Sequence, residues 1–310
     1  MITVVGSLNM DLIIRVPRFP EPGEAVHGDD LRTACGGKGA NQAYAIARMG
    51  RSVRMVGCVG GDAFGDAMVE NLRAAGVDTR GVLRRADKAS GTAMILVHDA
   101  TGQNEIVVAG GANRTLSAAE VHHAADILRQ ADAVVAQLET TPSATRAAMA
   151  LAREAGRLSV LNPAPFMPLD DELLGLCDFL IPNESEASQL TGLSVRDPES
   201  AAAAARLLRS RGARNVLITL GADGVWVESE AWCGHVPAFP VRAVDTVAAG
   251  DTFIGAFVAR LVEGASLREA AQFGCAAAAI AVTRPGAQPS IPSREEVTAF
   301  LRARSQESHK

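Results

Sequence analysis

The sequence predicts an α/β fold, a three-layer sandwich in which helices cover both faces of a mainly parallel central sheet, with a small β-sheet lid. Short apolar runs alternate with longer amphipathic runs over residues 117–228, which is typical of strands joined by helices. Hydrophobic residues make up 48% of the chain and aromatic residues only 4%, so small and branched aliphatic side chains must form the core, as they do around a covered parallel sheet. Two β-like stretches, at about 11–36 and 90–111, interrupt the alternation, and we expect them to form the lid.

Length, charge and cysteine content exclude several classes of protein. We expect the 310 residues to form one domain, because α/β folds often exceed the usual domain length. The net charge of -5 is spread over mixed acids and bases, which indicates neither a nucleic-acid groove nor a basic membrane-binding surface. The five cysteines are scattered without a C-x-x-C pair, which favours reduced thiols in the cytoplasm. The first strand leaves no room for a signal peptide, and no apolar run reaches membrane-spanning length.

The first third of the chain mixes strands and helices irregularly. Apolar or alternating runs predict strands here, and prolines and glycines near residues 17–23 interrupt them. The expected strands are 3–6, 12–16, 25–34, 53–59, 91–98 and 105–109, and the expected helices are one opened by 36–43 and ending near 49, and 63–75. The last two strands form a hairpin that we expect to pair with the earlier lid segment.

The remainder alternates more regularly. Ser117 with Glu120 predicts a capping box at the start of one helix. The expected helices are 117–131, 143–155, 184–190, 199–211, 254–262, 267–283 and 295–304, and the expected strands are 133–138, 158–161, 178–181, 216–220 and 225–228.

Polar residues follow several of these strands. Asn9 and Asp11 come just after the first strand and point the same way in an extended chain, so their side chains suit neighbouring hydroxyl groups of a ligand. An Asx-rich turn is the simpler alternative. Glu139, Asn183 and Thr219 also stand at strand ends, where open α/β sheets bind ligands. Each alone could be a cap or a surface residue, but their convergence favours a site.

The glycine-rich stretch 36–43 opens a helix and presents Lys38 and Asn41 at its start. Its three glycines let the backbone approach a ligand closely. The spacing is neither that of a phosphate-binding P-loop nor that of a dinucleotide fingerprint. A plain surface lysine is the alternative for Lys38, and the surrounding glycines favour a ligand contact.

Residues 243–253 provide the clearest indication of chemistry. Small residues lead directly into an apolar helix, so free backbone N–H groups and the helix dipole create an anion site. Asp251 lies inside that site, where a carboxylate would repel a bound phosphate. We expect it to act as a general base on an attacking hydroxyl, with a simple helix-capping role as the alternative.

Residues 36–43 and 245–251 resemble the two signatures of the PfkB, or ribokinase-like, family of sugar kinases. Further stretches resemble the same family over nearly the whole chain, namely 6–11, 162–165, 182–187, 218–221 and 286–290. The resemblance implies a ribokinase-like fold and transfer of a phosphoryl group from ATP to the 5-hydroxyl of D-ribose. It also implies Mg²⁺, an activating K⁺ ion and a homodimer formed through the lid.

The resemblance assigns roles to individual residues. Asp251 corresponds to the base. The implied sugar-binding residues are Asn9, Asp11, Gly37, Lys38, Gly39, Ala40, Asn41, Glu139 and Asp251. The implied ATP-binding residues are Asn183, Thr219, Leu220, Gly221, Ala222, Asp223, Gly224, Ala249, Gly250 and Cys275. Asn183 and Glu186 would hold magnesium through water, and the implied potassium ligands are Asp245, Val247, Ala281, Arg284, Gly286 and Ser290.

Two positions depart from the common family pattern. Ala248 replaces the first glycine of a Gly-Ala-Gly-Asp sequence, as in the ribose-phosphorylating branch, and Cys275 stands where an Asn or His often contacts adenine. A related kinase for 2-deoxyribose, a ketohexose or a nucleoside is the main alternative. A non-catalytic sugar-binding protein is disfavoured by the presence of Asp251 and its glycine. A dinucleotide oxidoreductase is disfavoured because no G-x-G-x-x-G sequence follows a strand.

Overall fold

A nine-stranded sheet forms the centre of the protein in a computed structural model that describes residues 1–307. Seven neighbouring strands are parallel, and at one edge two further strands are added by antiparallel pairing. The order across the sheet is β13-β12-β11-β10-β9-β8-β1-β4-β5. The strands are β1 (Ile2–Val5), β4 (Val53–Gly60), β5 (Asp78–Arg85), β8 (Ala133–Ala136), β9 (Leu158–Leu161), β10 (Phe179–Leu180), β11 (Asn215–Thr219), β12 (Val225–Glu228) and β13 (Gly234–Val236).

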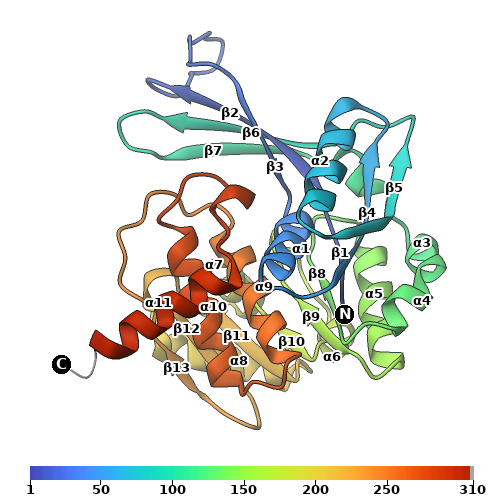
Figure 1. Ribbon diagram of the computed structural model, residues 1–310, viewed down its shortest axis with the longest axis vertical. Coiled ribbons are helices and arrows are strands. Elements are labelled where there is room, and N and C mark those ends of the chain that lie inside the picture. Colours follow the sequence, from blue (N-terminus) through green and yellow to red (C-terminus); the bar gives the residue numbers. More distant parts are fainter. Residues whose placement is uncertain (308–310) are drawn as a thin grey trace.

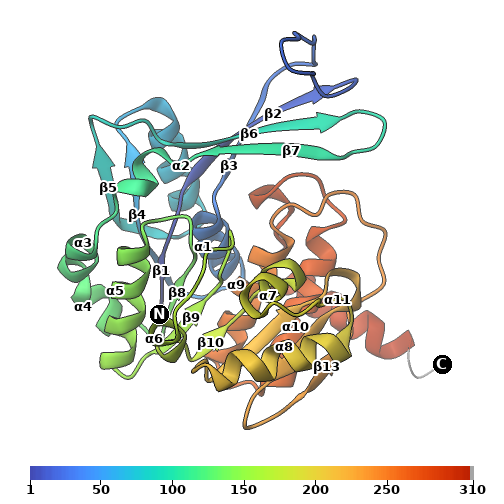
Figure 2. The same cartoon turned by 180° about the vertical axis from the view of Figure 1, so that it is seen from behind.

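Helices cover both faces of this sheet (Figures 1 and 2). Alternate residues of a strand point to opposite faces, so Val134 of β8 enters one hydrophobic core and its neighbour Val135 enters the other. The first core contains side chains of α3 (Ala118–His123), α4 (Ala125–Arg129), α5 (Pro142–Glu154), α6 (Asp171–Gly175), α7 (Glu184–Thr191) and α8 (Pro198–Ser210). The second contains side chains of α1 (Lys38–Arg48), α2 (Ala63–Ala74), α9 (Ala249–Leu261) and α10 (Leu267–Ala281). This arrangement confirms the predicted three-layer sandwich.

The last helix, α11 (Arg294–Glu307), packs outside these layers. Its buried Val297 joins a third, smaller cluster with Phe273 of α10 and Ala256 of α9. No helix within residues 1–307 is long and apolar enough to cross a membrane.

The order of the strands reverses at β1. From β1 the chain builds outward through β4 and β5, and it then returns to add β8 on the other side. In open α/β sheets, ligands bind beyond the carboxyl ends of the strands at such a reversal. The topology therefore places the candidate site beyond β1 and β8.

A separate four-stranded sheet has the order β3-β2-β6-β7 and projects beyond the main sheet (Figure 1). The parallel pairing of β2 with β6 joins the two predicted lid segments, as expected. The strands are β2 (Asn9–Val16), β3 (Arg32–Gly36), β6 (Gly91–His98) and β7 (Asn104–Ala109).

Several sequence-based boundaries were wrong. Residues 25–31 are not a strand, and β3 begins only at Arg32. β2 begins at Asn9 rather than at 12, so Asn9 and Asp11 lie within a strand and not in a turn. The predicted helix 117–131 is divided at Ala124, where ψ is 10°. The Ser117–Glu120 capping box is confirmed. Among the strands and α-helices of residues 1–307, β5, α6 and β13 were not predicted.

Three short 3-10 helices complete the described structure. They are η1 (Gly111–Thr115), η2 (Gly221–Asp223) and η3 (Gln288–Ser290), and each lies in a connection that carries candidate site residues or their neighbours.

Candidate active site

Asn9 and Asp11 lie at the start of strand β2, shortly after β1. Both side chains are buried, at 3% and 8% exposure. Asn113 of η1 fixes the orientation of Asn9, because its Nδ2 donates to Asn9 Oδ1 at 2.8 Å and to the carbonyl of Leu8 at 2.9 Å. With Oδ1 engaged, the Nδ2 group of Asn9 remains as a donor. The pair thus offers a donating amide beside an accepting carboxyl group, as a vicinal diol requires.

The glycine-rich start of α1 packs against the backbone that follows β1. A Cβ on Gly37 would lie 2.6 Å from the backbone N of Asn9, and one on Gly39 would lie 2.6 Å from that of Ser7. Ala40 N donates to the Ser7 carbonyl at 2.9 Å. These glycines were expected to let a ligand approach. The structure gives them a second role, because only glycine permits this contact between two chain segments.

Glu139, which follows β8, contacts both the segment after β1 and the start of α1. Its Oε2 accepts hydrogen bonds from Ser7 Oγ at 2.5 Å and from the backbone N of Lys38 at 3.1 Å. A carboxylate at this helix start is stabilised by the free N–H groups and the helix dipole. Glu139 therefore fixes the start of α1, and with it the position of the Lys38 side chain.

Asp251 lies in the first turn of α9 and is 7% exposed. Ala248 precedes the helix with φ 59° and is the one non-glycine residue of the described chain with positive φ. A left-handed alanine is strained, and such strain is concentrated at functional sites. Thr252 N and Oγ1 both donate to the Ala248 carbonyl at 2.8 Å, which holds this turn in place.

Two side-chain amides hold the Asp251 carboxylate. Asn41 Nδ2 donates to Oδ2 at 3.0 Å, and Gln42 Nε2 donates to Oδ1 at 2.9 Å. Gln42 Nε2 also approaches Asn162 Oδ1 at 3.2 Å. Because both carboxylate oxygens accept N–H groups, the ionised form of Asp251, which is the form that acts as a base, is stabilised and oriented.

Charges are concentrated around these side chains. Burial raises the pKa of Asp251, while the Lys38 charge and the two amides oppose that rise. Burial, with the negative charges of Glu139 and Asp251, raises the pKa of Asp11 to about 7. Burial lowers the pKa of Lys38, but the surrounding carboxylates outweigh it and the net pKa is raised. Such a cluster of perturbed groups is typical of a catalytic site.

The backbone at the start of α9 partly matches the expected anion site. Within residues 1–307, neither Gly250 N nor Asp251 N donates a backbone hydrogen bond. Ala249 N donates to the Thr246 carbonyl at 3.3 Å, so this predicted donor is engaged. The two free N–H groups are available to an anion.

Most of the predicted nucleotide residues lie at the ends of β10 and β11. A parallel bridge joins Asn183 to Thr219. Asn183 and Glu186 form a capping box on α7, with bonds of 2.8 and 2.9 Å, and burial raises the pKa of Glu186. The remaining residues of this set, Leu220, Gly221, Ala222, Asp223 and Gly224, form η2 and its ends.

Cys275 of α10 is 5% exposed and lies in the second hydrophobic core. Burial raises the pKa of its thiol to about 12. The side chain is therefore a small apolar group here, which suits packing against a neighbouring group rather than hydrogen bonding.

The predicted cation residues lie in two chain segments joined by Asp245. Its Oδ1 accepts from Val247 N at 3.0 Å and its Oδ2 from Gly286 N at 2.8 Å. Ser290 is fully buried, and its Oγ donates to the Ala287 carbonyl at 2.7 Å. Ala281 accepts from Arg284 N at 3.0 Å at the end of α10. Among residues 1–307, no group of three His, Cys, Asp or Glu side chains could hold a metal ion, so any cation here depends on carbonyl, hydroxyl and single carboxylate oxygens.

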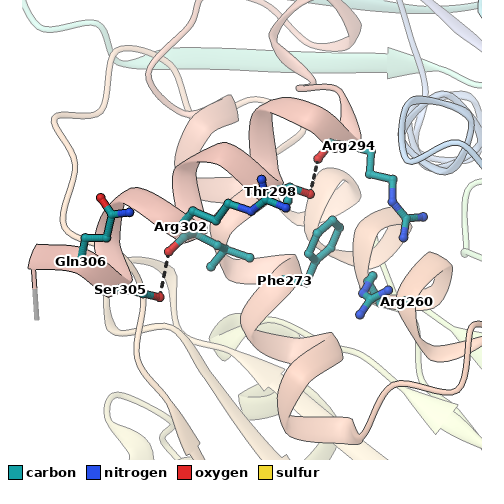
Figure 3. Close-up of a pocket in the computed structure, with 8 residues that line it drawn as sticks. Arg260, Phe273, Arg294, Thr298, Arg302, Ser305 and Gln306 are labelled. Carbon is teal, nitrogen blue, oxygen red and sulfur yellow. Dashed lines mark hydrogen bonds between the residues drawn. The ribbon is translucent and has the colours of Figure 1, made fainter. Parts of the chain in front are cut away.

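A groove of 590 Å³ lies apart from this site, between α9, α10 and α11. Figure 3 shows Arg260, Arg294 and Arg302 around Phe273. Glu263 pairs with both Arg260 and Arg294, and the hydroxyl of Thr298 bonds to the carbonyl of Arg294 at 2.8 Å. Since these groups bond to one another, we assign no ligand to the groove.

The comparison with protein families decides the family of the chain. The model of the "pfkB family carbohydrate kinase" matches residues 1–294. The chain belongs to this family. A ribokinase of Haemophilus influenzae is 45% identical over 300 residues, which cover 97% of this chain and 98% of the relative. A deoxyribokinase of Salmonella typhi is 38% identical over 302 residues, with 97% and 98% coverage.

A solved structure of this family gives the same fold. The structure of Arabidopsis thaliana ribokinase complexed with ribose and ATP superposes with a TM-score of 0.89 at 33% identity, and the match covers 97% of this chain and 98% of that one. Family membership, the sandwich fold and the small second sheet therefore agree with the resemblance noted in the sequence.

Sequence reasoning missed four polar residues that hold the site together. Gln42 donates a hydrogen bond to Asp251, and Gln288 donates one to Asn41. Asn113 orients Asn9, and Ser7 donates a hydrogen bond to Glu139. Gln42 and Gln288 lie within stretches that resemble the family, and Asn113 follows a Gly-Gly pair. Ser7 lies in the family-like stretch 6–11 and directly follows the predicted strand 3–6, so a signal was present there as well.

Proposed function

We propose that this kinase transfers the γ-phosphoryl group of ATP to the 5-hydroxyl of D-ribose, giving D-ribose 5-phosphate and ADP. The burial of Asp251 at the start of α9, held by Asn41 and Gln42, is the observation that carries the proposal. The similarity to ribokinases supports ribose as the sugar.

The chemistry asked of the protein is alignment, proton removal and charge neutralisation. Asn9 and Asp11 would bind ribose hydroxyls and place the 5-hydroxyl near Asp251. Gly37, Lys38, Gly39, Ala40, Asn41 and Glu139 would complete the sugar-binding side. Asp251 would take the hydroxyl proton as the oxygen attacks phosphorus. The N–H groups of Gly250 and Asp251 would face the transferring phosphoryl group, whose charge Lys38 would help to neutralise.

The nucleotide would bind along the ends of β10 and β11. We propose Asn183, Thr219 and the turn 220–224 as its protein contacts, with Cys275 against the adenine. A magnesium ion neutralises charge on the transferred phosphates. Asn183 and Glu186 would hold this magnesium ion through water molecules. Their side chains are already oriented by the capping box, and Glu186 lies near the Lys38 charge.

We also propose a potassium site formed by Asp245, Ser290 and the carbonyls of Val247, Ala281, Arg284 and Gly286. An oxygen-only donor set with one carboxylate suits a hard cation of low charge. The bonds from Asp245 to Val247 and Gly286 already draw the two segments together. A bound cation would stabilise the turn that leads into Ala248 and the anion site.

A homodimer through the lid is the proposed assembly. Four apolar side chains of β6 and β7 are at least half exposed in the single chain, and they are Met94, Ile106, Val107 and Val108 at 53, 50, 70 and 52%. Met94 pairs with Val107, so these two side chains share one face of the small sheet, whereas Ile106 and Val108 point to the opposite face. Exposed apolar side chains on an edge hairpin are unfavourable in a monomer. Two such sheets packed through the face of Met94 and Val107 would bury those two side chains.

We propose that residues 1–310 act as one kinase domain, with lid segments at about 11–36 and 90–111. We propose the cytoplasm as its location, on the basis of the scattered free cysteines.

The test is ADP release by the purified protein with magnesium-ATP and D-ribose, against 2-deoxyribose, fructose and adenosine. Each reaction is run in potassium and then in sodium buffer. Preference for ribose, with faster turnover in potassium, would support the proposal. Preference for 2-deoxyribose would transfer the assignment to that sugar, and equal rates in the two buffers would contradict the potassium site.

A further inference from the structure

A chain of side-chain amides extends from Asp251 through Asn41 and Gln288 to Asn71. Asn41 donates through Nδ2 to Asp251 and accepts at Oδ1 from Gln288 Nε2 at 3.2 Å. Gln288 in turn accepts at Oε1 from Asn71 Nδ2. Asn41 and Gln288 are 6% and 3% exposed, so water cannot readily replace either partner.

The carboxylate fixes the direction of every bond in this chain. An ionised Asp251 only accepts hydrogen bonds, so Asn41 must present its Nδ2 group to it. The opposite side of Asn41 is then a carbonyl oxygen, which requires a donor. Gln288 supplies that donor and leaves its own carbonyl for Asn71. Reversing the Asn41 amide would place its oxygen against the carboxylate and leave Gln288 Nε2 without an acceptor.

Gln288 also belongs to the loop that carries the proposed cation ligands. It lies in η3 between Gly286 and Ser290, and Gly286 N bonds to Asp245. Asn71 lies on α2, which packs against β2 and β3 of the small sheet. One buried side chain thus connects the cation loop, the helix beside the lid and, through Asn41, the base.

We propose that Gln288 is a positioning residue of the phosphoryl transfer. It holds the Asn41 amide in the one orientation that donates to Asp251, and it couples the loop of Asp245, Gly286 and Ser290 to the base. The inference rests on the proposed role of Asp251, but it assigns a function to a residue that need not touch sugar, nucleotide or metal.

Two variants separate this role from simple packing. Gln288→Met keeps the length and removes both hydrogen bonds, so Asn41 is free to turn; kcat should fall about tenfold while KM for ATP is unchanged. Gln288→Glu still accepts from Asn71 but competes with Asp251 for Nδ2 of Asn41. The acidic limb of kcat/KM for ribose should then move upward by about one pH unit. Gln130→Glu, on an exposed side chain, is the matched control and should change neither quantity.

Other ionisable groups face Asp251 and must be considered in that profile. Lys38 on α1 and Glu139 after β8 act on it directly, and Asp11 on β2 and Glu186 on α7 belong to the same cluster. All four are unchanged in the Gln288 variants, so a difference between profiles reports on the substitution. The added charge of Gln288→Glu would by itself shift the acidic limb of the kcat/KM profile. A double-mutant cycle is therefore needed to show whether Gln288 acts through Asn41.

The cycle combines Gln288→Met with Asn41→Leu. If Gln288 acts through Asn41, Gln288→Met should have no further effect on kcat once Asn41 is gone. Additive losses would overturn the proposal. Thermal unfolding of each variant, compared with the unmodified protein, confirms that folded proteins are being compared.

A second readout does not depend on turnover. The side-chain amide protons of Asn41, assigned by their loss in Asn41→Leu, should exchange slowly in the unmodified protein and at least tenfold faster in Gln288→Met. Unchanged exchange would refute the positioning role whatever the substrate. Full activity of an Asp251→Asn protein would instead refute the proposed function, so the two failures are distinguishable.

Discussion

Asn41 Nδ2 lies 3.0 Å from Asp251 Oδ2, although 210 positions separate the two residues in the sequence. One belongs to the glycine-rich start of α1 and the other to the start of α9, and these two helices pack against each other. The contact unites the two stretches that the sequence marks as most distinctive. It also means that the stretch proposed to bind the sugar and the stretch proposed to bind the phosphoryl group share one hydrogen-bonded centre.

The close contact at Gly39 gives a prediction about stability. In Gly39→Ala the new Cβ would lie 2.6 Å from Ser7 N and 2.7 Å from Gly6 Cα, and backbone cannot move as readily as a side chain. We expect a loss of about 1–3 kcal/mol in unfolding free energy, measured by urea denaturation. Gly175→Ala is the control, because no heavy atom lies within 4 Å of its Cβ. Equal stability of the two variants would show that the contact is not tight.

Gly250→Ala should affect activity without affecting folding. No heavy atom lies within 4 Å of the added Cβ, and alanine is favoured over glycine in a helix by up to about 1 kcal/mol. If a phosphoryl group binds at the start of α9, the methyl group crowds it and kcat/KM for ATP should fall about tenfold or more. Stability and kinetics are measured on the same preparation. Unchanged kinetics would place the phosphoryl group elsewhere.

Asp11 should make the ligand-free protein less stable as the pH rises. Its folded pKa of about 7 exceeds the ordinary value of 3.8 for an aspartate side chain, so the folded state binds the proton more tightly than the unfolded state. This contribution to stability is complete below pH 4 and is lost as the pH rises to about 7. Asp11→Asn should remove that dependence and raise the unfolding free energy at pH 8 by up to about 4 kcal/mol.

The control for Asp11 is Asp126→Asn, at a carboxylate that is 91% exposed. It should leave the pH dependence of unfolding unchanged. A parallel dependence in Asp11→Asn and the unmodified protein would mean that another buried carboxyl group is responsible.

The exposed face of the small sheet gives a prediction about assembly. Met94 and Val107 are directly paired across β6 and β7 and therefore share one face. Val107→Glu places a charge in that patch, and we expect sedimentation velocity to show a monomer where the unmodified protein is a dimer. Leu207→Glu, at a 37% exposed leucine on α8, should leave the dimer intact. A dimer that survives Val107→Glu would mean that a different surface mediates association.

The fold was largely predictable because it depends on short-range patterns. The apolar runs of β1, β4 and β8 and the capping box at Ser117 are local signals, and the structure confirms them. β5 escaped prediction because the sequence DTRGVLRR is an edge strand without alternation. The strand predicted at 25–34 forms only from Arg32 onward, because β2 pairs with residues 32–36 and no ladder partner pairs with residues 25–31.

The site was predictable only in part. Residues at strand ends and in the two signature stretches were identified from their own surroundings. The groups that orient these residues were not identified, because each is far from its partner in the sequence. Gln288 and Asn41 are 247 positions apart, and Asn113 and Asn9 are 104 positions apart. A side chain that acts through a distant partner leaves no periodic pattern in a single sequence. Its role becomes visible only when the hydrogen bonds of the folded chain are known.

The base assignment is the central claim and is tested most directly by ADP release from magnesium-ATP and D-ribose in Asp251→Asn. The amide is isosteric, so the variant should fold and bind ribose, while turnover should fall at least about a thousandfold. Binding measured by calorimetry on the same sample separates lost chemistry from lost affinity. Near-normal turnover by a folded Asp251→Asn protein would contradict the account.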